Sequence, residues 1–428
     1  MDYHSPSIKM SNGQLQVPDT ITIPYIPGDG IGVEVTKAMQ AIVDYALLKA
    51  YQGEKKIIWV EVLAGEKAFR ETSEWLPQET LHSFSRYLVG IKGPLTTPVG
   101  KGIRSLNVAL RKDLDLYVCL RPVRYFQGIS SPVVNPEKID ITIFRENTED
   151  VYTGIEFEAD SEQAEKFLHW MEENLPEAHK KIRFSQTVGL GIKLISKNGS
   201  QRLVKAAIEY AIQNRKPVVT LVHKGNIMKF TEGSFRNWGY DLAEEEYSNH
   251  VYTARQFETS IKTLGYTEAK EEKKRELKKG KIYVNDVIAD AAFQNLLLYP
   301  QNFSVIATTN LNGDYLSDAL AAQVGGIGIS PGANINYETG IAIFEATHGT
   351  APDIAGKNLA NPSSLILSSV MMLDYIGWHE AAKLITTSLE KTIKNAQLTY
   401  DLAQFIPTAK ALSTNEFSQA IIDNFNSI

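Results

Sequence analysis

Short apolar runs alternate with longer amphipathic stretches along most of the chain. Residues 20–26 and 57–62 are apolar runs typical of buried strands, and between them apolar residues recur at helical spacing from Val35 to Ala50. The same reading predicts strands at 88–91, 114–120, 139–144, 218–223, 303–307 and 341–344, and helices at 201–214 and 361–375. Strands that alternate with helices in this way predict an α/β fold.

The glycine-rich turn after the first strand, residues 27–32 (PGDGIG), does not match the dinucleotide-binding fingerprint. Its glycines are spaced G-x-G-x-G, whereas the fingerprint of a Rossmann fold needs G-x-G-x-x-G at this place. The order strand, glycine turn, helix, strand is that of an open α/β sheet, but this motif argues against a Rossmann fold.

Composition and charge are those of an ordinary globular protein. The chain has 428 residues, enough for two or three domains, and a net charge of −6 with no basic patch that would favour nucleic acid. No apolar stretch reaches the roughly 18 residues of a membrane span, and the N-terminus lacks a signal-peptide pattern. The single cysteine, Cys119, fits a reducing compartment. We therefore expect a cytoplasmic protein that binds neither nucleic acid nor membrane.

Three acidic residues suggest a metal site. Asp314 and Asp318 are four residues apart, and a helix that begins near Asn312 would place both on one face, directly after the strand at 303–307. A third acid, Asp290, lies upstream. Converging carboxylates need a cation, and oxygen ligands suit Mg²⁺ or Mn²⁺. On spacing alone, a role as simple helix-capping acids is equally compatible.

Three arginines, Arg111, Arg121 and Arg145, are expected near the ends of three separate elements. Guanidinium forks bind carboxylates through two parallel hydrogen bonds, so this set favours an anionic substrate beside the acids. A single arginine at such a place is usually a surface ion pair. Lys224, directly after the strand at 218–223, is compatible with a surface charge or a catalytic amine.

Six motifs distributed over the chain are each specific: RSLNVALR (104–111), LRPVRYFQG (120–128), FRENTEDVYTG (144–154), HKGNIMKFTEG (223–233), NLNGDYLSDALAAQVGG (310–326) and EATHGTAPDIAG (345–356). Together they resemble the bacterial isocitrate dehydrogenases within the family of β-decarboxylating dehydrogenases. The resemblance covers nearly the whole chain, from PGDGIG to the C-terminal helices.

The resemblance implies the isocitrate/isopropylmalate dehydrogenase-like fold, which is α/β but not Rossmann. It has a large α/β domain made from both chain ends, a small α/β domain, and an inserted clasp that interlocks with the clasp of a second copy. The active sites of this homodimer lie at the interface. The expected boundaries are 1–116 and 325–428 for the large domain, 117–149 and 197–324 for the small domain, and 150–196 for the clasp.

The resemblance also implies a role for each candidate residue. The substrate would be isocitrate, bound by Ser105, Asn107, Arg111, Arg121 and Arg145. The metal ligands would be Asp314 and Asp318 of one chain with Asp290 of the partner subunit. Tyr152 and Lys224 of the partner subunit resemble the acid and base of an oxidative decarboxylation that yields 2-oxoglutarate and CO₂.

The cofactor stretch departs from the pattern of the NADP-dependent members. Those typically carry Lys-Tyr after HGTAP and an arginine four residues after a tyrosine, where this chain has Asp353, Ile354 and Gln404, the last of these four residues after Tyr400. A carboxylate at Asp353 can bind ribose hydroxyls and would repel a 2′-phosphate, so we expect NAD as the cofactor. The expected cofactor-binding residues are Thr97, His348, Gly349, Asp353, Ile354, Asn361 and Tyr400.

Two alternatives remain open. Isopropylmalate and homoisocitrate dehydrogenases share Asp-Ile after Ala-Pro, although Ser105 and Asn107 favour the γ-carboxylate of isocitrate. A non-catalytic metabolite sensor on the same scaffold is the other alternative, and the retention of Tyr152, Lys224 and all three acids argues against it.

Overall fold

The computed structural model describes residues 6–96 and 105–427, and its centre is a mixed sheet of 11 strands. In spatial order the strands are β11 (Val251–Thr253), β12 (Ile282–Ile288), β10 (Val218–His223), β13 (Val305–Thr308), β7 (Asp140–Glu146), β6 (Val118–Arg124), β14 (Pro331–Ile335), β15 (Ala342–Ala346), β5 (Val89–Lys92), β3 (Thr20–Ile26) and β4 (Lys56–Glu61). Strands β11 to β7 are parallel, as are β15 to β4. The two groups are joined through antiparallel pairings of β6 and β14, so they run in opposite directions.

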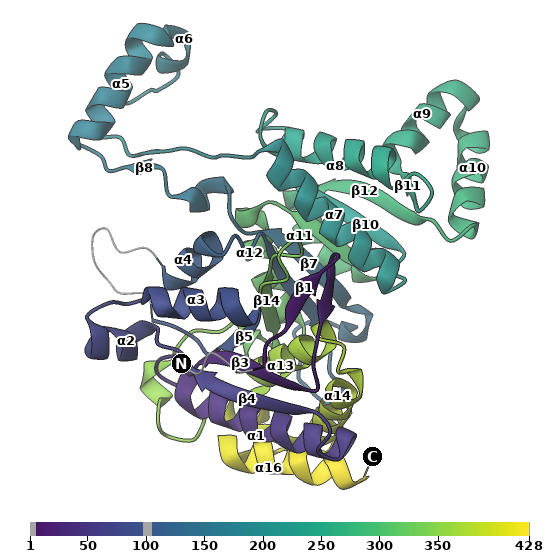
Figure 1. Cartoon of the computed structure of the whole chain (residues 1–428). Coiled ribbons are helices and arrows are strands. Elements are labelled where there is room, and N and C mark those ends of the chain that lie inside the picture. Colours follow the sequence, from purple (N-terminus) through teal and green to yellow (C-terminus); the bar gives the residue numbers. More distant parts are fainter. Residues whose placement is uncertain (1–5, 97–104, 428) are drawn as a thin grey trace.

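Helices from both ends of the chain pack together beside the β3–β4 side of the sheet (Figure 1). The layer contains α1 (Gly32–Tyr51), α13 (Ser363–Tyr375), α14 (His379–Lys394) and α16 (Thr414–Asn424). The predicted apolar stripe of α1, including Val35, Met39, Ile42 and Val43, is buried. Burial of such a stripe is what stabilises an amphipathic helix on a core. The sequence pattern of α1 therefore predicted both the helix and its buried face.

The remaining helices cover the two halves of the sheet or connect its strands. They are α2 (Gly65–Thr72), α3 (Gln78–Tyr87), α4 (Leu106–Asp113), α7 (Lys197–Gln213), α8 (Glu232–Glu246), α9 (Ala254–Leu264), α10 (Tyr266–Lys278), α11 (Ala289–Leu298), α12 (Asn310–Gln323) and the short α15 (Tyr400–Ala403). The 3₁₀ turns are η1 (Pro136–Lys138), η2 (Asp150–Thr153), η3 (Pro300–Asn302), η4 (Ile327–Ile329), η5 (Pro352–Ile354) and η6 (Phe425–Ser427). No helix in the described residues is both long and apolar enough to cross a membrane.

The small strands form three separate two-stranded sheets. They pair β1 (Lys9–Ser11) with β2 (Gln14–Gln16), β8 (Glu156–Phe157) with β9 (Leu190–Gly191), and β16 (Gln397–Thr399) with β17 (Lys410–Leu412). The β8–β9 pair leads to α5 (Glu162–Asn174) and α6 (Pro176–His179), which project away from the rest of the molecule (Figure 1). In residues 182–196, β9 is only two residues long.

The strand expected at 114–120 is shifted towards the C-terminus. Asp115 adopts a φ of 46°, and the N–H of Leu116 donates to the carbonyl oxygen of Arg111, which closes a turn after α4. A left-handed residue cannot continue a strand, so β6 begins only at Val118 and runs to Arg124. Arg121 therefore lies inside a strand and not at its end, which corrects the expectation from the sequence.

Candidate active site

Polar side chains form a row on one face of the central strands. Strand register places Arg145 opposite Cys119, Cys119 opposite Asn334, and Glu345 opposite Lys92. Side chains alternate between faces along a strand, so Arg145, Arg121, Asn334, Glu345 and Lys92 all point to the same side. The sheet thus places arginines from β6 and β7 next to charged side chains from β5 and β15.

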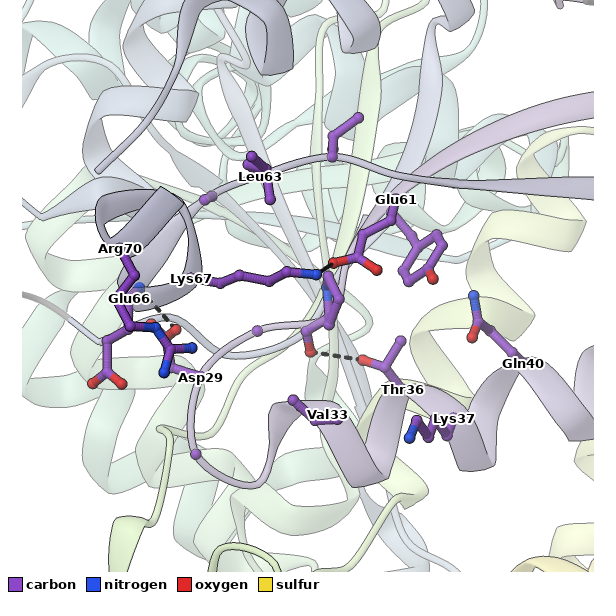
Figure 2. Close-up of a pocket in the computed structure, with 16 residues that line it drawn as sticks. Asp29, Val33, Thr36, Lys37, Gln40, Glu61, Leu63, Glu66, Lys67 and Arg70 are labelled. Carbon is purple, nitrogen blue, oxygen red and sulfur yellow. Dashed lines mark hydrogen bonds and ion pairs between the residues drawn. The ribbon is translucent and has the colours of Figure 1, made fainter. Parts of the chain in front are cut away.

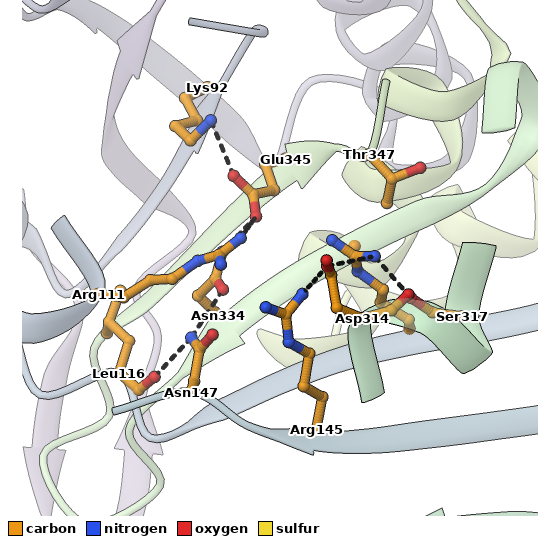
Figure 3. A network of polar contacts seen from close by, with 12 residues as sticks. Lys92, Arg111, Leu116, Arg145, Asn147, Asp314, Ser317, Asn334, Glu345 and Thr347 are labelled. Carbon is orange, nitrogen blue, oxygen red and sulfur yellow. Dashed lines mark hydrogen bonds and ion pairs between the residues drawn. The ribbon is translucent and has the colours of Figure 1, made fainter. Parts of the chain in front are cut away.

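Arg145 is the most deeply buried of these cations, with 1% of its side chain exposed. Its Nε and Nη2 donate to Oδ1 of Asn310 at 2.9 and 2.7 Å, and its Nη1 contacts Asp314 (Figure 3). The guanidinium lies over the ring of Tyr152, 4.9 Å from its centroid. Because Asn310, Asp314 and the Tyr152 ring all contact the guanidinium, Arg145 is held in one orientation. In that orientation its charge faces the acids of α12.

Helix α12 begins at Asn310, two residues before the expected start, and carries Asp314 and Asp318 on one face. The Tyr152 hydroxyl donates to Asp314 Oδ2 at 2.9 Å, and Arg121 Nη1 lies 3.2 Å from Asp318 Oδ1 and 4.0 Å from Asp314 Oδ1. Burial raises the pKa of Asp314, but Arg145 and Arg121 outweigh this effect and the net pKa is lowered. The carboxylate of Asp314 is therefore ionised near neutral pH.

A second buried group joins Glu345 to Arg111 and Lys92 (Figure 3). Glu345 accepts hydrogen bonds from Arg111 Nη2 at 2.9 Å and Asn334 Nδ2 at 2.7 Å, and Lys92 Nζ lies at 2.8 Å. Asn147 Nδ2 continues the chain by donating to Asn334 Oδ1 at 2.9 Å. Burial raises the pKa of Glu345, but Lys92 and Arg111 hold it well below its usual value.

Sequence reasoning missed Lys92, Asn334 and Glu345. The signal available was a charged residue at the end of an otherwise apolar run, at 88–92 and again at 341–345. Nothing in one sequence says that these two runs are neighbours in a sheet, so the pairing could not be read from the pattern.

Ser105 and Asn107 lie at the start of α4, Ser105 as its N-cap residue and Asn107 in its first turn, both half-buried. Three buried polar atoms of this region lack a hydrogen-bond partner among the described residues: Oδ1 of Asn107, Nε of Arg111 and Nε of Arg121. Native proteins rarely leave such atoms unpaired, so their clustering is a mark of a polar ligand site.

Lys224 and Asp290 form a separate pair. Lys224 Nζ lies 2.5 Å from Asp290 Oδ1, and Asp290 is 70% exposed. The hydrogen bond from Lys224 lowers the pKa of Asp290. In the part of the chain that the structure describes, no group of three His, Cys, Asp or Glu side chains is placed to hold a metal. One chain therefore brings Asp314 and Asp318 together but does not add Asp290.

The predicted cofactor residues lie on the loop after β15 and beside α15. The loop is held against the glycine turn of residues 27–32, because the N–H of Ile31 donates to Thr350 O at 2.9 Å. Burial lowers the pKa of His348, whose Nε2 is buried without a partner in the described residues, while its Nδ1 contacts the Gly349 carbonyl at 2.9 Å. Asp353 is exposed on η5, next to the half-buried Ile354.

Asn361 links this loop to α15. Its Nδ2 donates to Asp401 Oδ2 at 3.0 Å, beside the exposed Tyr400. The N-cap residue of α13 is Pro362, and Asn361 Oδ1 accepts a hydrogen bond from the N–H of Ser363 at 3.0 Å. Gln404 Nε2 donates to Asp401 O at 3.0 Å. Thr97 lies outside the described residues.

A separate cavity of about 290 Å³ opens at the carboxyl ends of β3 and β4, between α1 and α2 (Figure 2). Asp29, Glu61 and Lys67 line it, and Lys67 pairs with Glu61. None of the site residues predicted from the sequence lines this cavity.

The fold and the site together define a class of α/β protein in which buried arginines lie next to a pair of acids on one helix. Residues 22–421 match the isocitrate/isopropylmalate dehydrogenase family. The chain belongs to that family. The resemblance read from the motifs is thereby confirmed at the level of the family, and the α/β fold with its large mixed sheet is confirmed with it.

Similar proteins cover nearly the whole chain. The isocitrate dehydrogenase [NADP] of Staphylococcus epidermidis is 56% identical over 417 residues, 97% of this chain and 98% of its own. The isocitrate dehydrogenase [NADP] of Streptococcus mutans is 54% identical over 415 residues, which cover 97% of this chain and 98% of its own. The crystal structure of isocitrate dehydrogenase from Methylococcus capsulatus has a TM-score of 0.75 at 32% identity, covering 95% of this chain and 99% of that one.

The names of these relatives contradict the expectation of NAD, since curated proteins more than half identical to this chain are named for NADP. The prediction gave too much weight to the charge of Asp353. That carboxylate is exposed, where solvent and salt screen it and its side chain is free to turn away. The chain also places Lys357 in the turn that follows η5, with its N–H bonded to Ile354 O. The expectation of NAD is therefore wrong.

Proposed function

We propose that the protein oxidises and decarboxylates isocitrate to 2-oxoglutarate and CO₂, with NADP as the hydride acceptor and Mg²⁺ or Mn²⁺ as the metal. The observation that carries the proposal is the convergence of Arg111, Arg121 and Arg145 beside the acids of α12. A tricarboxylate offers three anionic groups to such a set. Guanidinium pairs of this kind bind carboxylates with defined orientation.

The Nε atoms of Arg111 and Arg121 have no partner in the part of the chain that the structure describes, and they suit the carboxylates of this substrate. Ser105 and Asn107 at the start of α4 would contact a further carboxylate through a hydroxyl and an amide. Arg145 is already committed to Asn310 and Asp314, so it supplies positive charge from a fixed position. Together these side chains would bind the substrate and fix its orientation in the site.

Two side chains of the protein handle protons in the reaction. The partner subunit's Lys224, in its neutral amine form, accepts the proton of the C2 hydroxyl as the hydride leaves C2. After the β-carboxylate departs as CO₂, the Tyr152 hydroxyl donates a proton to C3, which completes 2-oxoglutarate. Burial and Asp314 raise the pKa of Tyr152, with Arg145 opposing them, so the phenol keeps its proton at neutral pH. A protonated phenol is what a general acid requires.

The acids of α12 fit a hard divalent cation. Asp314 is ionised and Asp318 has 60% of its side chain exposed, so both offer oxygen atoms at the surface of the cluster. When bound, Mg²⁺ or Mn²⁺ supplies positive charge that polarises the C2 oxygen and stabilises the charge left after loss of CO₂. We infer that Asp290 of the partner subunit completes the ligand set, because among the described residues no third acid joins Asp314 and Asp318.

The loop of residues 348–361 and Tyr400 would hold NADP, which supplies the hydride acceptor. His348 offers a buried ring nitrogen that has no partner among the described residues, and its lowered pKa favours the neutral ring. Asn361 and Asp353 lie on the same loop, and Lys357 provides a cation for the 2′-phosphate.

We further infer a homodimer with shared active sites, built from the large domain, small domain and clasp at the boundaries given above. Two exposed apolar side chains support it: Ile227 and Phe230, the latter 90% exposed, follow Lys224 on its loop. Large exposed apolar groups of this kind mark contact surfaces. The cytoplasmic location remains a prediction.

Steady-state kinetics test the proposed reaction. With Mn²⁺ and NADP, we expect kcat/KM for isocitrate to exceed that for 3-isopropylmalate by at least about 100-fold, since arginines and polar groups left unpaired penalise the wrong substrate. A chelator should abolish the activity and added Mn²⁺ should restore it. Equal turnover of 3-isopropylmalate, or full activity with the chelator present, would contradict the proposal.

The same assay tests the cofactor. We expect a higher kcat/KM with NADP than with NAD at saturating isocitrate. A higher value with NAD would contradict this part of the proposal and leave the reaction itself intact.

A further inference from the structure

A half-buried lysine lies between two buried acids at the base of the projecting segment. Lys193 Nζ is 2.5 Å from Asp150 Oδ1 and 2.8 Å from Glu232 Oε1. Both carboxylates have no exposed side-chain surface, and Lys193 is 17% exposed. These three residues, called the Lys193 triad below, have no direct part in the proposed chemistry.

Asp150 connects the triad to the turn that carries Tyr152. It is the first residue of η2, with a φ of 68°, and its Oδ1 accepts from the N–H of Val151 at 2.8 Å. Its Oδ2 accepts from the N–H of Leu311 in the first turn of α12 at 3.0 Å. Asp150 therefore fixes Tyr152 relative to the helix that carries Asp314.

Glu232 connects the triad to the Lys224 loop and again to α12. Its Oε2 accepts from the Lys224 N–H and from Asn312 Nδ2, both at 2.9 Å. Its Oε1 accepts from the Thr309 hydroxyl at 2.8 Å in addition to Lys193. One carboxylate thus binds four donors from three segments, and no acceptor position is left to water.

We propose that Lys193 is a positioning residue of the reaction: by joining Asp150 to Glu232 it holds the Tyr152 turn, the Lys224 loop and the N-terminus of α12 in one arrangement. The inference rests on the proposed function, because it assigns Tyr152 and Lys224 their roles as acid and base. In the proposed dimer, Lys224 acts in the site of the partner subunit, so each triad contacts parts of both active sites.

A lysine is needed here because two buried carboxylates repel each other without a cation. Burial lowers the pKa of Lys193, but Asp150 and Glu232 more than compensate, and the net pKa is raised. The ammonium therefore stays charged. The N-termini of α8 and α12 add partial positive charge beside the two acids.

The test compares Lys193→Met with Lys193→Arg in the full-length enzyme, with Mn²⁺, isocitrate and NADP. Calorimetric titration with isocitrate and Mn²⁺ counts the binding-competent sites, and kcat is expressed per such site. Lys216→Met is the matched control, because Lys216 pairs at 2.7 Å with Asp140, an acid with 65% of its side chain exposed, away from these segments.

We expect Lys193→Met to lower kcat per competent site by about 10- to 100-fold, since misplaced catalytic groups lose rates of this order. The dissociation constant for isocitrate should change by less than kcat does, because Arg111 and Arg121 lie on α4 and β6, outside the joined segments. Lys193→Arg should recover most of kcat, as it restores the charge between the acids. Lys216→Met should match the wild type.

The possible outcomes distinguish failure of the proposed function from failure of the positioning role of Lys193. A wild-type enzyme without isocitrate activity overturns the proposed function and the role of Lys193 with it. An active wild type and an unchanged kcat per competent site in Lys193→Met overturn the positioning role alone, as does a Lys193→Arg variant no better than Lys193→Met. A merely destabilised protein would show fewer competent sites at full kcat, which also counts against the positioning role.

Discussion

The side chain of Glu345 is buried and ionised because Lys92, Arg111 and Asn334 surround its two oxygens. Replacing it by glutamine leaves two buried cations without a counter-charge, a change that typically costs about 3–5 kcal/mol. We expect Glu345→Gln to lower the free energy of unfolding by this amount at pH 7. Urea unfolding measures it. Glu390→Gln, which breaks the half-exposed pair with Arg124, is the control and should cost less than about 1 kcal/mol.

The loss of stability in Glu345→Gln should depend on pH. The pKa of Glu345 in the folded protein is lowered from an ordinary value of 4.5, so its charge contributes stability above about pH 4.5. That contribution is lost as the pH falls below 4.5 towards the folded pKa. The stability difference between wild type and Glu345→Gln should therefore stay constant from pH 7 to about pH 5 and shrink as the pH falls from 4.5 towards 3. A difference that does not shrink below pH 4.5 would show that the carboxylate is not ionised in the folded state.

Asp353 offers a second prediction at the scale of one residue. An exposed carboxylate near a bound phosphate exerts a weak, salt-screened repulsion. With NADP, Asp353→Asn should therefore raise kcat/KM by no more than about fivefold at moderate salt, and by less at high salt. Steady-state kinetics at two salt concentrations provide the measurement. A much larger gain would mean that Asp353 is held against the phosphate.

Helix α12 shows what a single element contributes. It places Asp314 and Asp318 one turn apart, and Leu311 and Asn312 in its first turn donate hydrogen bonds to Asp150 and Glu232. Asp314→Asn removes a charged oxygen ligand, so we expect the Mn²⁺ concentration for half-maximal activity to rise by about 10- to 100-fold. Metal titration of the activity checks this. Tyr315→Phe on the same helix is the control, and an unchanged Mn²⁺ requirement in Asp314→Asn would exclude the acid as a ligand.

Elements with a strong local signal could be predicted from the sequence. The stripe of α1 and the four-residue spacing of Asp314 and Asp318 need only neighbouring residues, and both correspond to helices in the structure. Features made by distant segments could not. The pairing of Glu345 with Lys92 needs the strand order β15–β5, and the left-handed Asp115 that delays β6 gave no sign in the apolar run around it. The prediction of NAD was wrong because it considered the charge of Asp353 without the exposure of that side chain to solvent.

At the scale of the whole molecule, a single chain contains two separate groups: Tyr152 with Asp314, and Lys224 with Asp290. In the proposed dimer, a second copy would complete a site that needs Tyr152 and Lys224 together. This arrangement makes a prediction about mixtures. Tyr152→Phe and Lys224→Ala homodimers should each be nearly inactive, since every site lacks one of the two proton-transfer groups.

Mixing the two variants after reversible dissociation should restore activity. A heterodimer has one site with both residues intact and one site with neither, so random reassociation, in which half of the dimers are mixed, should recover about a quarter of the wild-type rate. Activity measured before and after dissociation and reassociation tests this, and mixing without dissociation is the control. If each chain built a complete site from its own Tyr152 and Lys224, exchange would restore nothing, because every site would still carry one defect.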